Sequence, residues 1–390
     1  MSESAEVRFG IVGVGGMGAN HAKNLMNGKV KGARLVAVCD KEAAHLAKYP
    51  DVAQFDDVEV MLRSGEIDAL LIATPHYSHT TIGIASLEAG IHTLVEKPIS
   101  VHKADCERLI AAHTDSSVVF SAMFNQRTDP FWQKIRSLVQ AGELGKIQRI
   151  NWIITDWFRT DFYYSSGGWR ATWKGEGGGV LLNQCPHNLD LWQWMFGMPE
   201  SVYADCRIGQ YHDIEVEDEV TAYMRYANGA TGVFITSTGE APGTNRLEIS
   251  GDRGRLVYES GKLEWKRNEV PTAEHCRTNK GKFSKPSTWD VSFPLNPSNH
   301  GPQHVGIMQN FTNAILDGTE LIAPASEGIH SVELGNAMML SSAKQEWVDL
   351  PMEGAEYETL LKKRIETSTF EKKTVDPSEG EDDFAKSFNV

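Results

Sequence analysis

The stretch Phe9-Gly-Ile-Val-Gly-Val-Gly-Gly-Met-Gly18 decides the fold of the first part of the chain. A short apolar run, Phe9–Val12, leads into the pattern Gly-x-Gly-x-x-Gly, and a helix-like segment follows over Gly18–Met26. A strand, a glycine turn and a helix in this order favour binding of a dinucleotide. The glycines let the backbone approach a pyrophosphate, whose charge is stabilised at the helix N-terminus. The same pattern also occurs in turns that bind no ligand.

An acidic residue at the end of the next predicted strand indicates the preferred cofactor. Asp40 follows the apolar run Leu35–Val38, about 20 residues after the glycine turn. A carboxylate there accepts hydrogen bonds from ribose hydroxyls and repels a 2′-phosphate, so the sequence predicts NAD rather than NADP. Lys41 beside it weakens this discrimination. The cofactor contacts predicted in this region are Gly13, Gly15, Gly16, Met17, Gly18 and Asp40.

Short β-branched runs alternate with helix-like segments as far as residue 127, which predicts a parallel sheet with crossover helices. Gly90 supplies a helix stop signal after the segment Thr80–Ala89. We therefore expect a dinucleotide-binding Rossmann domain over residues 6–127. Its further strands are predicted at Ala69–Ala73, His92–Val95 and Val118–Ala122, and a further helix at Val58–Ser64.

Longer alternating segments dominate from Ile147 onward and predict a mostly antiparallel sheet. Two of them, Val216–Tyr226 and Ala230–Thr238, are joined through Asn228-Gly229, a strong hairpin signal. The fold class is therefore α/β, with an N-terminal Rossmann domain and a C-terminal α+β domain, residues 128–352, built on a large open sheet. The other strands are expected at Gln148–Thr155, Ser201–Ile208, Leu247–Ser250 and Leu256–Glu259, and the helices at Trp132–Ala141, Asn188–Phe196, Val305–Asp317 and Gly328–Ser342.

Length, charge and cysteine usage limit the classes of protein. A chain of 390 residues exceeds the usual size of a single core, and its net charge of −14 disfavours binding to nucleic acid. Five widely spaced cysteines without a C-x-x-C pair indicate reduced thiols and a cytoplasmic protein. We recognise neither a secretory signal nor an apolar stretch long enough to span a membrane. Residues 353–390 are expected to form an acidic extension that is disordered at its end.

Several spaced motifs follow the glycine turn. They are Thr74-Pro75 at a strand end, Glu96-Lys97-Pro98, Asn125-x-Arg127, Gly142-x-x-Gly145-Lys146-Ile147, Gly177-Gly178-Gly179 leading to His187-x-x-Asp190, and Asn310-Phe311-x-x-Ala314-Ile315-x-x-Gly318. In this order they resemble the Gfo/Idh/MocA family of sugar and polyol oxidoreductases, over about residues 6–351. The family commonly has Asn where this chain has His76. The resemblance implies further cofactor contacts from Thr74, Pro75, His76, His79, Glu96 and Lys97.

Lys97 and His187 are the predicted catalytic residues. Lys97 follows a strand at the carboxyl edge of the sheet, where α/β proteins bind ligands, and could hold a substrate hydroxyl. His187 is expected in the first turn of a helix that begins near Asn183, on the same helix face, with a lowered pKa that suits a general base. The resembled family usually has Asp at the position of Asn183, and an amide can only orient a hydroxyl or the imidazole. Asp190 fits a structural role better.

Aromatic residues are dense between Trp152 and Trp173 and predict a loop rich in large rings. Such a loop suits a carbohydrate face and a subunit interface about equally. The histidine pairs His76/His79 and His300/His304 have no third ligand placed by the sequence, so no metal site is predicted. The predicted substrate contacts are Lys97, Asn125, Tyr163, Trp169, Arg170, Asn183 and His187.

The resemblance implies transfer of a hydride between NAD(H) and a secondary hydroxyl of a sugar, glycoside or cyclic polyol, with sugar C3 as one candidate position. His187, helped by Lys97, would remove the hydroxyl proton. Two alternatives stay open: an enzyme that retains NAD and cleaves a glycosidic bond through transient oxidation, and a non-enzymatic dinucleotide-binding sensor. The expected partners are a small carbohydrate or polyol and further copies of the chain in a homodimer or homotetramer.

Overall fold

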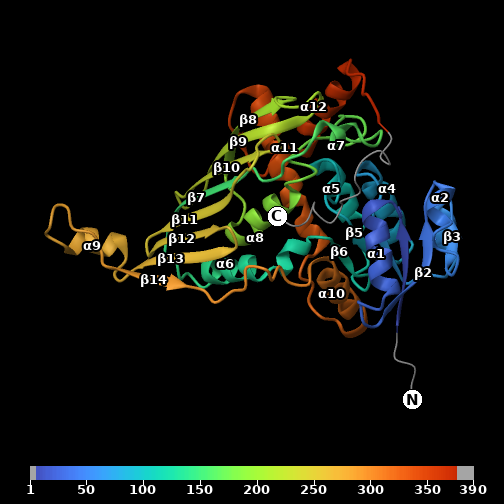
Figure 1. Cartoon of the computed structure of the whole chain (residues 1–390), viewed down its shortest axis with the longest axis horizontal. Helices are drawn as coiled ribbons and strands as arrows, with labels where there is room; N and C mark the ends of the chain where they lie inside the picture. The colour runs from blue at the N-terminus through green and yellow to red at the C-terminus, as the bar shows by residue number, and fades with distance from the viewer. Residues whose placement is uncertain (1–5, 376–390) are drawn as a thin grey trace.

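Two β-sheets organise the protein (Figure 1). The computed structural model describes residues 6–375. The first sheet has six strands and belongs to the N-terminal part of the chain, and the second has nine strands and belongs to the C-terminal part. The predicted fold class, a Rossmann-like parallel sheet followed by a large and mostly antiparallel sheet, is therefore confirmed.

The strands of the first sheet run parallel in the order β3-β2-β1-β4-β5-β6. The strand order reverses between β1 and β4, which is where open α/β sheets bind their ligands. β4 is buried along its whole length, as expected of a parallel strand covered on both faces. The elements of this part are β1 (Val7–Val12), α1 (Gly16–Met26), β2 (Ala33–Cys39), α2 (Ala43–Leu46), β3 (Ala53–Phe55), α3 (Val58–Arg63), β4 (Ala69–Ile72), α4 (Tyr77–Glu88), β5 (His92–Val95), α5 (Lys103–Ala111), β6 (Phe120–Ala122) and the 3-10 turn η1 (Asn125–Thr128).

The strands of the second sheet take the order β14-β13-β12-β11-β7-β10-β9-β8-β15. All neighbouring strands in it are antiparallel except β7 and β10, which run parallel. The predicted hairpin is confirmed, because β9 and β10 pair around Asn228-Gly229. The strands are β7 (Ile147–Ile154), β8 (Ser201–Ile208), β9 (Glu217–Arg225), β10 (Thr231–Ser237), β11 (Asn245–Gly251), β12 (Gly254–Glu259), β13 (Lys262–Asn268), β14 (Thr288–Ser292) and β15 (Val348–Asp349).

Helices α6 (Pro130–Gln140), α8 (Pro186–Phe196) and α11 (Gly328–Lys344) cover one face of the second sheet (Figure 1). The ring of Trp152 on β7 is fully buried between helix residues, with ring centroids 5.1 Å from Trp132 on α6 and 6.5 Å from Trp192 on α8. The other face carries charged side chains such as Arg255 and Glu259, which are exposed. Trp152 therefore belongs to the hydrophobic core between this face and the helices.

The chain returns to the first sheet after it has formed the second. Phe311 on α10 (Gln303–Asp317) belongs to the core of the first sheet, and its ring centroid lies 5.9 Å from that of Phe9. The remaining elements are α7 (Asp161–Ser165), α9 (Thr272–Thr278), the 3-10 turn η2 (Ala325–Glu327) and α12 (Gly354–Thr367), the last of which packs on α5 and α11. The two sheets are therefore joined by packing as well as by the chain.

Some elements were not predicted from the sequence, among them β3, α5, β13, β14 and α12. The edge strand β14 and its neighbour β13 escaped prediction because one face of this sheet is open, so that their few apolar residues stand between charged and polar ones. The predicted elements that are present differ from the structure by a few residues at their ends. One boundary, the start of α8, matters for the site and is described below.

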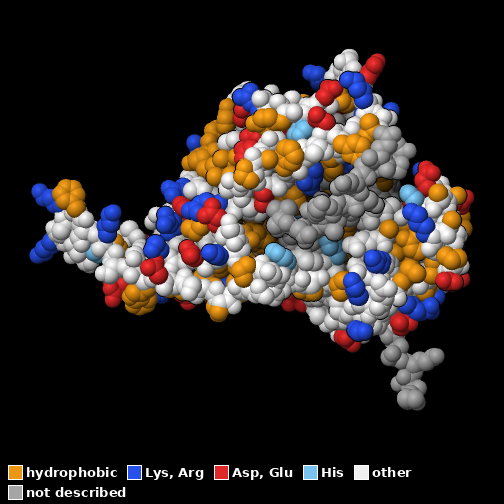
Figure 2. Space-filling view, viewed as in Figure 1, with side chains coloured by type: hydrophobic (Ala, Val, Ile, Leu, Met, Phe, Trp, Pro, Cys, Tyr) orange, Lys and Arg blue, Asp and Glu red, His pale blue; other side chains and the backbone are white. Residues whose placement is uncertain are grey.

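A projection formed by α9 and the residues after it extends from the edge of the second sheet (Figure 1). Figure 2 shows basic side chains gathered at its tip, a local cluster that the sequence analysis did not identify. Phe283 in this segment is 94% exposed. The basic residues here are Arg277, Lys280, Lys282 and Lys285.

Within residues 6–375, no helix is long and apolar enough to cross a membrane. The C-terminal extension contains α12 and a following segment up to residue 375. The end of the extension, for which disorder was predicted, lies outside the described residues.

Candidate active site

The glycine turn between β1 and α1 leaves room for close approach of a ligand. Gly13 has a φ of +80°, and a Cβ there would lie 2.7 Å from the carbonyl oxygen of Ala73. A Cβ at Gly18 would lie 1.8 Å from the carbonyl oxygen of Gly13, whereas a Cβ at Gly15 would meet no atom within 4 Å. The turn itself requires Gly13 and Gly18, and the open space at Gly15 fits the pyrophosphate of a dinucleotide.

Asp40 lies directly beside this turn. Its Oδ2 accepts a hydrogen bond from the backbone nitrogen of Val14 at 2.8 Å, and its Oδ1 accepts one from that of Glu42 at 2.9 Å. These bonds hold the carboxylate in place between the turn and the loop after β2. Gly16 and Met17 form the start of α1, two residues earlier than predicted. The predicted cofactor contacts of this region therefore lie together.

The loops after β4 and β5 are joined by His79. Its Nδ1 lies 2.7 Å from the carbonyl oxygen of Pro98, and its Nε2 lies 2.8 Å from that of Thr74. His79 is buried and uses both ring nitrogens for this contact. The hydroxyl of Thr74 is buried without a partner among the described residues, and Pro75 beside it is exposed. Thr74 thus offers a polar group to a cofactor at the edge of the sheet.

Lys97 follows β5 and reaches the second domain. Its Nζ donates a hydrogen bond to the backbone carbonyl of Asn183 at 2.8 Å. Burial lowers the pKa of Lys97, the charge of Glu96 raises it, and Arg170 lowers it again. A lysine with a lowered pKa exchanges a proton more readily near neutral pH.

Glu96 is held by groups of the protein itself. Its Oε1 lies 2.6 Å from Nε2 of His21 on α1, and its Oε2 accepts a hydrogen bond from the backbone nitrogen of Lys97 at 3.1 Å. Burial raises the pKa of Glu96, but the hydrogen bond and charge of His21 outweigh burial and hold that pKa at about 2. His304 on α10 has its ring centroid 5.5 Å from that of His21, and burial lowers its pKa to about 4. The sequence analysis missed His21 as a site residue, and no spacing rule connects it with Glu96.

His187 is the second residue of α8 and is buried. The predicted helix start near Asn183 is wrong, because the Gly179 carbonyl accepts hydrogen bonds from the backbone of Leu182 and Asn183 and closes a separate turn first. Asn183 and His187 therefore do not share one helix face. Burial lowers the pKa of His187 well below its usual value, and the charge of Lys97 lowers it further. A neutral imidazole in this place can accept a proton near neutral pH.

Glu176 is a buried carboxylate that the sequence analysis missed. Its Oε2 accepts a hydrogen bond from the backbone nitrogen of Ala171 at 2.6 Å, and its Oε1 accepts one from the side-chain amide of Asn183. The pKa of Glu176 is raised, because burial outweighs the charge of Arg170 and these hydrogen bonds, which lower it. The family that the sequence motifs resemble usually has Asp at the position of Asn183. This chain has an amide there, and the carboxylate of Glu176 binds that amide.

Tyr163 lies between two guanidinium groups. Its ring centroid is 5.1 Å from Cζ of Arg159 and 4.9 Å from Cζ of Arg170. Its hydroxyl accepts hydrogen bonds from Arg170 and from the side chain of Gln184, both at 3.1 Å. Arg170 also covers the ring of Trp169 at 4.5 Å. These contacts connect the side chains of the aromatic loop to one another.

The aromatic loop meets the cofactor edge through His76. The ring of Trp169 stands edge-on to that of His76 at 5.4 Å, and Nδ1 of His76 lies 3.3 Å from the carbonyl oxygen of Glu176. Burial lowers the pKa of His76 well below its usual value. Other rings of this loop, those of Trp157 and Trp173, are buried in the core. Part of the aromatic density is therefore ordinary packing.

The C-terminal segment also contacts the aromatic loop. Nζ of Lys372 donates a hydrogen bond to the carbonyl oxygen of Arg170 at 2.5 Å, and the backbone nitrogen of Val375 donates one to Ser165 at 3.1 Å. Arg364 on α12 lies over the ring of Trp173 at 4.4 Å. Sequence reasoning missed this contribution because these residues are far from the loop along the chain.

Asn125 and Arg127 lie in η1, at the boundary between the two sheets. The amide nitrogen of Asn125 donates to the side chain of Gln303 at 2.6 Å, and its Oδ1 is buried without a partner among the described residues. Arg127 is bound by the carboxylate of Asp190 at 2.8 and 2.6 Å, with both side chains buried. Asp190 therefore has the predicted structural role, and Asn125 retains an acceptor for a ligand.

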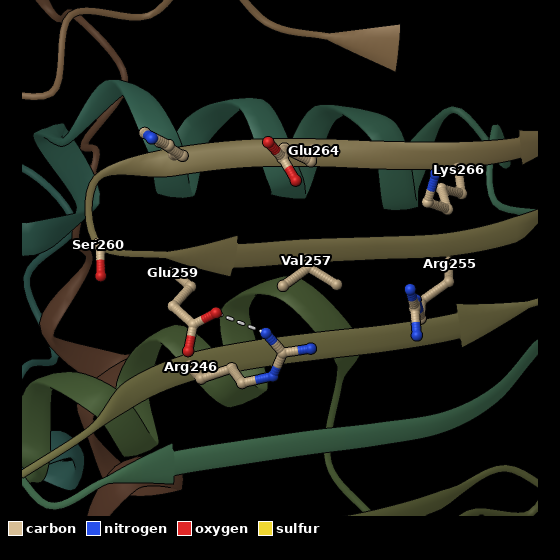
Figure 3. A pocket seen from close by; sticks show the side chains of 8 residues that line it. Arg246, Arg255, Val257, Glu259, Ser260, Glu264 and Lys266 are labelled. Atoms are coloured by element: carbon tan, nitrogen blue, oxygen red, sulfur yellow. Dashed lines mark hydrogen bonds and ion pairs between the residues drawn. The ribbon is translucent and has the colours of Figure 1, made fainter. Parts of the chain in front are cut away.

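A groove on the open face of the second sheet is separate from this site (Figure 3). Charged side chains of β11 to β13 line it, and several are already paired, such as Arg246 with Glu259 at 2.6 Å. None of the predicted site residues lines this groove. In the part of the chain that the structure describes, no three His, Cys, Asp or Glu residues are grouped to hold a metal ion.

Fold and site together define a two-domain oxidoreductase with a dinucleotide-binding Rossmann domain. The family profile described as "Oxidoreductase family, NAD-binding Rossmann fold" matches residues 7–124, and that of the GFO/IDH/MocA C-terminal domain matches residues 132–257. The chain belongs to the Gfo/Idh/MocA family, as the motifs indicated. It is an NAD-dependent oxidoreductase, and the predicted cofactor is confirmed.

Similar proteins have been characterised or solved. The chain is 26% identical over 266 residues to myo-inositol 2-dehydrogenase of Thermotoga maritima, which covers 65% of this chain and 75% of the relative. It is 25% identical over 321 residues to levoglucosan dehydrogenase of Pseudarthrobacter phenanthrenivorans, covering 73% and 80%. The crystal structure of the WlbA dehydrogenase from Chromobacterium violaceum with NADH and UDP-GlcNAcA is similar with a TM-score of 0.77 and 26% identity, covering 90% of this chain and 98% of that chain.

Proposed function

We propose that the protein transfers a hydride between NAD(H) and a secondary hydroxyl of a sugar, glycoside or cyclic polyol, with C3 of a sugar as a candidate position. One observation carries this proposal: the amine of Lys97 bridges from the cofactor edge to Asn183, in the turn that leads to His187. When bound, NAD supplies the hydride acceptor at this edge. The side chains supply positioning and proton transfer.

Each polar group of the site has a separate task. The Lys97 amine donates a hydrogen bond to the hydroxyl oxygen of the substrate. His187 takes the hydroxyl proton, because its lowered pKa keeps the imidazole neutral at neutral pH. Asn183 and Asn125 orient further hydroxyl groups through their amides. The cofactor would be held by Gly13, Gly15, Gly16, Met17, Gly18, Asp40, Thr74, Pro75, His76, His79, Glu96 and Lys97.

The aromatic loop supports a cyclic carbohydrate or polyol as the substrate. The ring of Trp169 offers an apolar surface to the C–H groups of a sugar ring, and Arg170 and the hydroxyl of Tyr163 beside it offer hydrogen-bonding groups. The names of the relatives, inositol and levoglucosan dehydrogenases, are consistent with this class.

We further propose three features of the whole chain. It divides into a Rossmann domain (residues 6–127), a substrate and oligomerisation domain (128–352) and a C-terminal extension (353–390). The open face of the second sheet, which exposes Tyr223 and Trp347, joins copies of the chain into a homodimer or homotetramer. All five cysteines are unpaired, which supports a cytoplasmic location.

The proposal is tested by adding NAD to the purified protein with a panel of inositols, free hexoses and glycosides, while NADH absorbance and product are followed. NADH formation with one class is the expected result. Product formation from a glycoside with no net NADH would replace it with the NAD-retaining glycosidase. NAD binding without turnover of any compound would favour the dinucleotide-binding sensor.

A further inference from the structure

We propose that Glu176 is a positioning residue that turns the side-chain carbonyl oxygen of Asn183 toward the substrate, where it accepts a hydrogen bond from a hydroxyl group. The inference rests on the proposed function, since it concerns how the same site holds its substrate. It assigns a specificity-determining task to a buried carboxylate that lies behind the site.

The first step concerns Oε2 of Glu176. This oxygen accepts a hydrogen bond from the backbone N–H of Ala171 at 2.6 Å. Ala171 has a φ of +57°, a left-handed conformation that is unfavourable for a non-glycine residue. A backbone N–H can only donate, so Oε2 is committed to be an acceptor. The backbone N–H of Ala171 therefore fixes Oε2 of Glu176 as an acceptor and leaves Oε1 for other contacts.

The second step concerns Oε1, which faces the amide of Asn183. The NH2 group of Asn183 donates a hydrogen bond to this oxygen and therefore points toward Glu176. The planar amide then directs Oδ1 away from Glu176. Lys97 binds the backbone carbonyl of the same asparagine, so that both the main chain and the side chain of Asn183 are held. These bonds leave Oδ1 of the partly exposed Asn183 for a ligand.

The third step concerns the surroundings of that oxygen. The guanidinium group of Arg170 lies near Glu176 and can only donate hydrogen bonds. The proton of the reacting hydroxyl goes to His187. A further hydroxyl group whose oxygen accepts from Arg170 still carries a proton that needs an acceptor. Oδ1 of Asn183 supplies this acceptor. The site therefore favours a substrate hydroxyl over an ether oxygen or a halogen in the same place, because neither of these can donate.

Glu176→Gln provides a sharp test of this arrangement. The N–H of Ala171 still requires an oxygen opposite it, so the NH2 group of the introduced glutamine has to face Asn183. Asn183 must then turn its own oxygen inward and present NH2 to the substrate. A substrate hydroxyl loses its acceptor, and kcat/KM is expected to fall about ten- to hundredfold. NAD affinity should stay unchanged, because neither residue is a proposed cofactor contact.

The double variant Glu176→Gln/Asn183→Asp should restore an acceptor oxygen that faces the substrate. The introduced glutamine donates to one oxygen of the introduced aspartate, and the other oxygen of that aspartate again faces the substrate as an acceptor. We expect the kcat/KM of the double variant to recover to within about fivefold of wild type. Asn183→Asp alone places two carboxylates against each other and should lower both stability and kcat/KM. Glu240→Gln, at an exposed carboxylate, is the matched control and should behave as wild type.

Two readouts keep this inference distinct from the proposed function. Kinetics with the best substrate of the panel test the direction of Oδ1, and recovery in the double variant supports it; equal loss in the single and double variants overturns it. Thermal unfolding of the four variants tests the pair without any substrate. A positive coupling, in which the double variant is more stable than the sum of the single changes allows, is expected, and additivity overturns the inference. If wild type oxidises nothing, the proposed function fails, and the unfolding cycle still decides on the pair.

Discussion

The cofactor edge and the substrate side of this site are built in different ways. The glycine turn of the cofactor edge depends on backbone shape within a short stretch of chain, where Gly13 and Gly18 close the turn and Asp40 binds the backbone of Val14. The substrate side depends on side-chain contacts between distant segments, such as Lys97 with Asn183 and Lys372 with Arg170. Changes on the two sides should therefore separate binding of NAD from turnover of the substrate.

The largest effect is expected on the substrate side. His187→Ala removes the proposed proton acceptor, and Lys97→Ala removes the donor to the substrate hydroxyl. Each change should lower kcat by about 10²- to 10⁴-fold. Steady-state rates with the best substrate measure the loss. Calorimetric titration with NAD is the control for the His187 variant and should give a nearly unchanged affinity. A rate within about tenfold of wild type would remove the residue from the catalytic assignment.

The glycine turn offers a matched pair of changes on the cofactor side. Gly15→Ala adds a methyl group where the protein has no atom within 4 Å, so it should weaken NAD binding and leave the melting temperature unchanged. Gly18→Ala forces a methyl group against the carbonyl of Gly13 and should also lower stability by about 1–3 kcal/mol. NAD titration and thermal unfolding of both variants measure the difference. Equal stability losses would contradict this account of the turn.

The dependence of kcat/KM on pH should reveal His187. Burial lowers its pKa below 6.5, so the base is lost only when the pH falls through a value under 6.5. Above that value the imidazole is neutral and competent. A pH series at subsaturating substrate measures the acidic limb, with NAD affinity checked at each pH. A midpoint above 6.5 would show that another group titrates.

The smallest effect is expected from the C-terminal segment. Lys372→Ala removes the hydrogen bond to the carbonyl of Arg170 in the aromatic loop. Because the loop is then held less firmly, KM should rise about two- to tenfold with little change in kcat. Lys373→Ala is the control, because the side chain of Lys373 is 89% exposed. Equal KM values for the two variants would exclude a role of this segment in the site.

The sequence allowed prediction of features that depend on neighbouring residues. The glycine turn, Asp40 and the hairpin at Asn228-Gly229 are local patterns whose geometry follows from residue type. One local feature, the start of α8, was predicted wrongly: the helix begins at Pro186 and not near Asn183. The turn before α8 is closed by backbone hydrogen bonds to the carbonyl of Gly179, and such bonds do not depend on residue type, so the sequence does not predict them.

Prediction failed for contacts that arise only when distant segments fold together. His21 meets Glu96 across 75 residues, and Lys372 meets Arg170 across 202 residues. Neither pair has a characteristic spacing. Glu176 lies close to Asn183 in sequence, but its proposed role follows from the left-handed backbone at Ala171. An alanine in the sequence does not predict this conformation. Side-chain partners in a site of this kind require the folded structure.

The central claim is that this site moves a hydride from a substrate carbon to NAD with net release of NADH. It is tested most directly by a single-turnover experiment, in which NADH and oxidised product are counted against active sites with the best substrate of the panel. The account predicts one NADH for each molecule of ketone formed, at a rate about 10²- to 10⁴-fold lower in the His187→Ala variant. Product without an equivalent of NADH, or unchanged NADH formation by that variant, would contradict it.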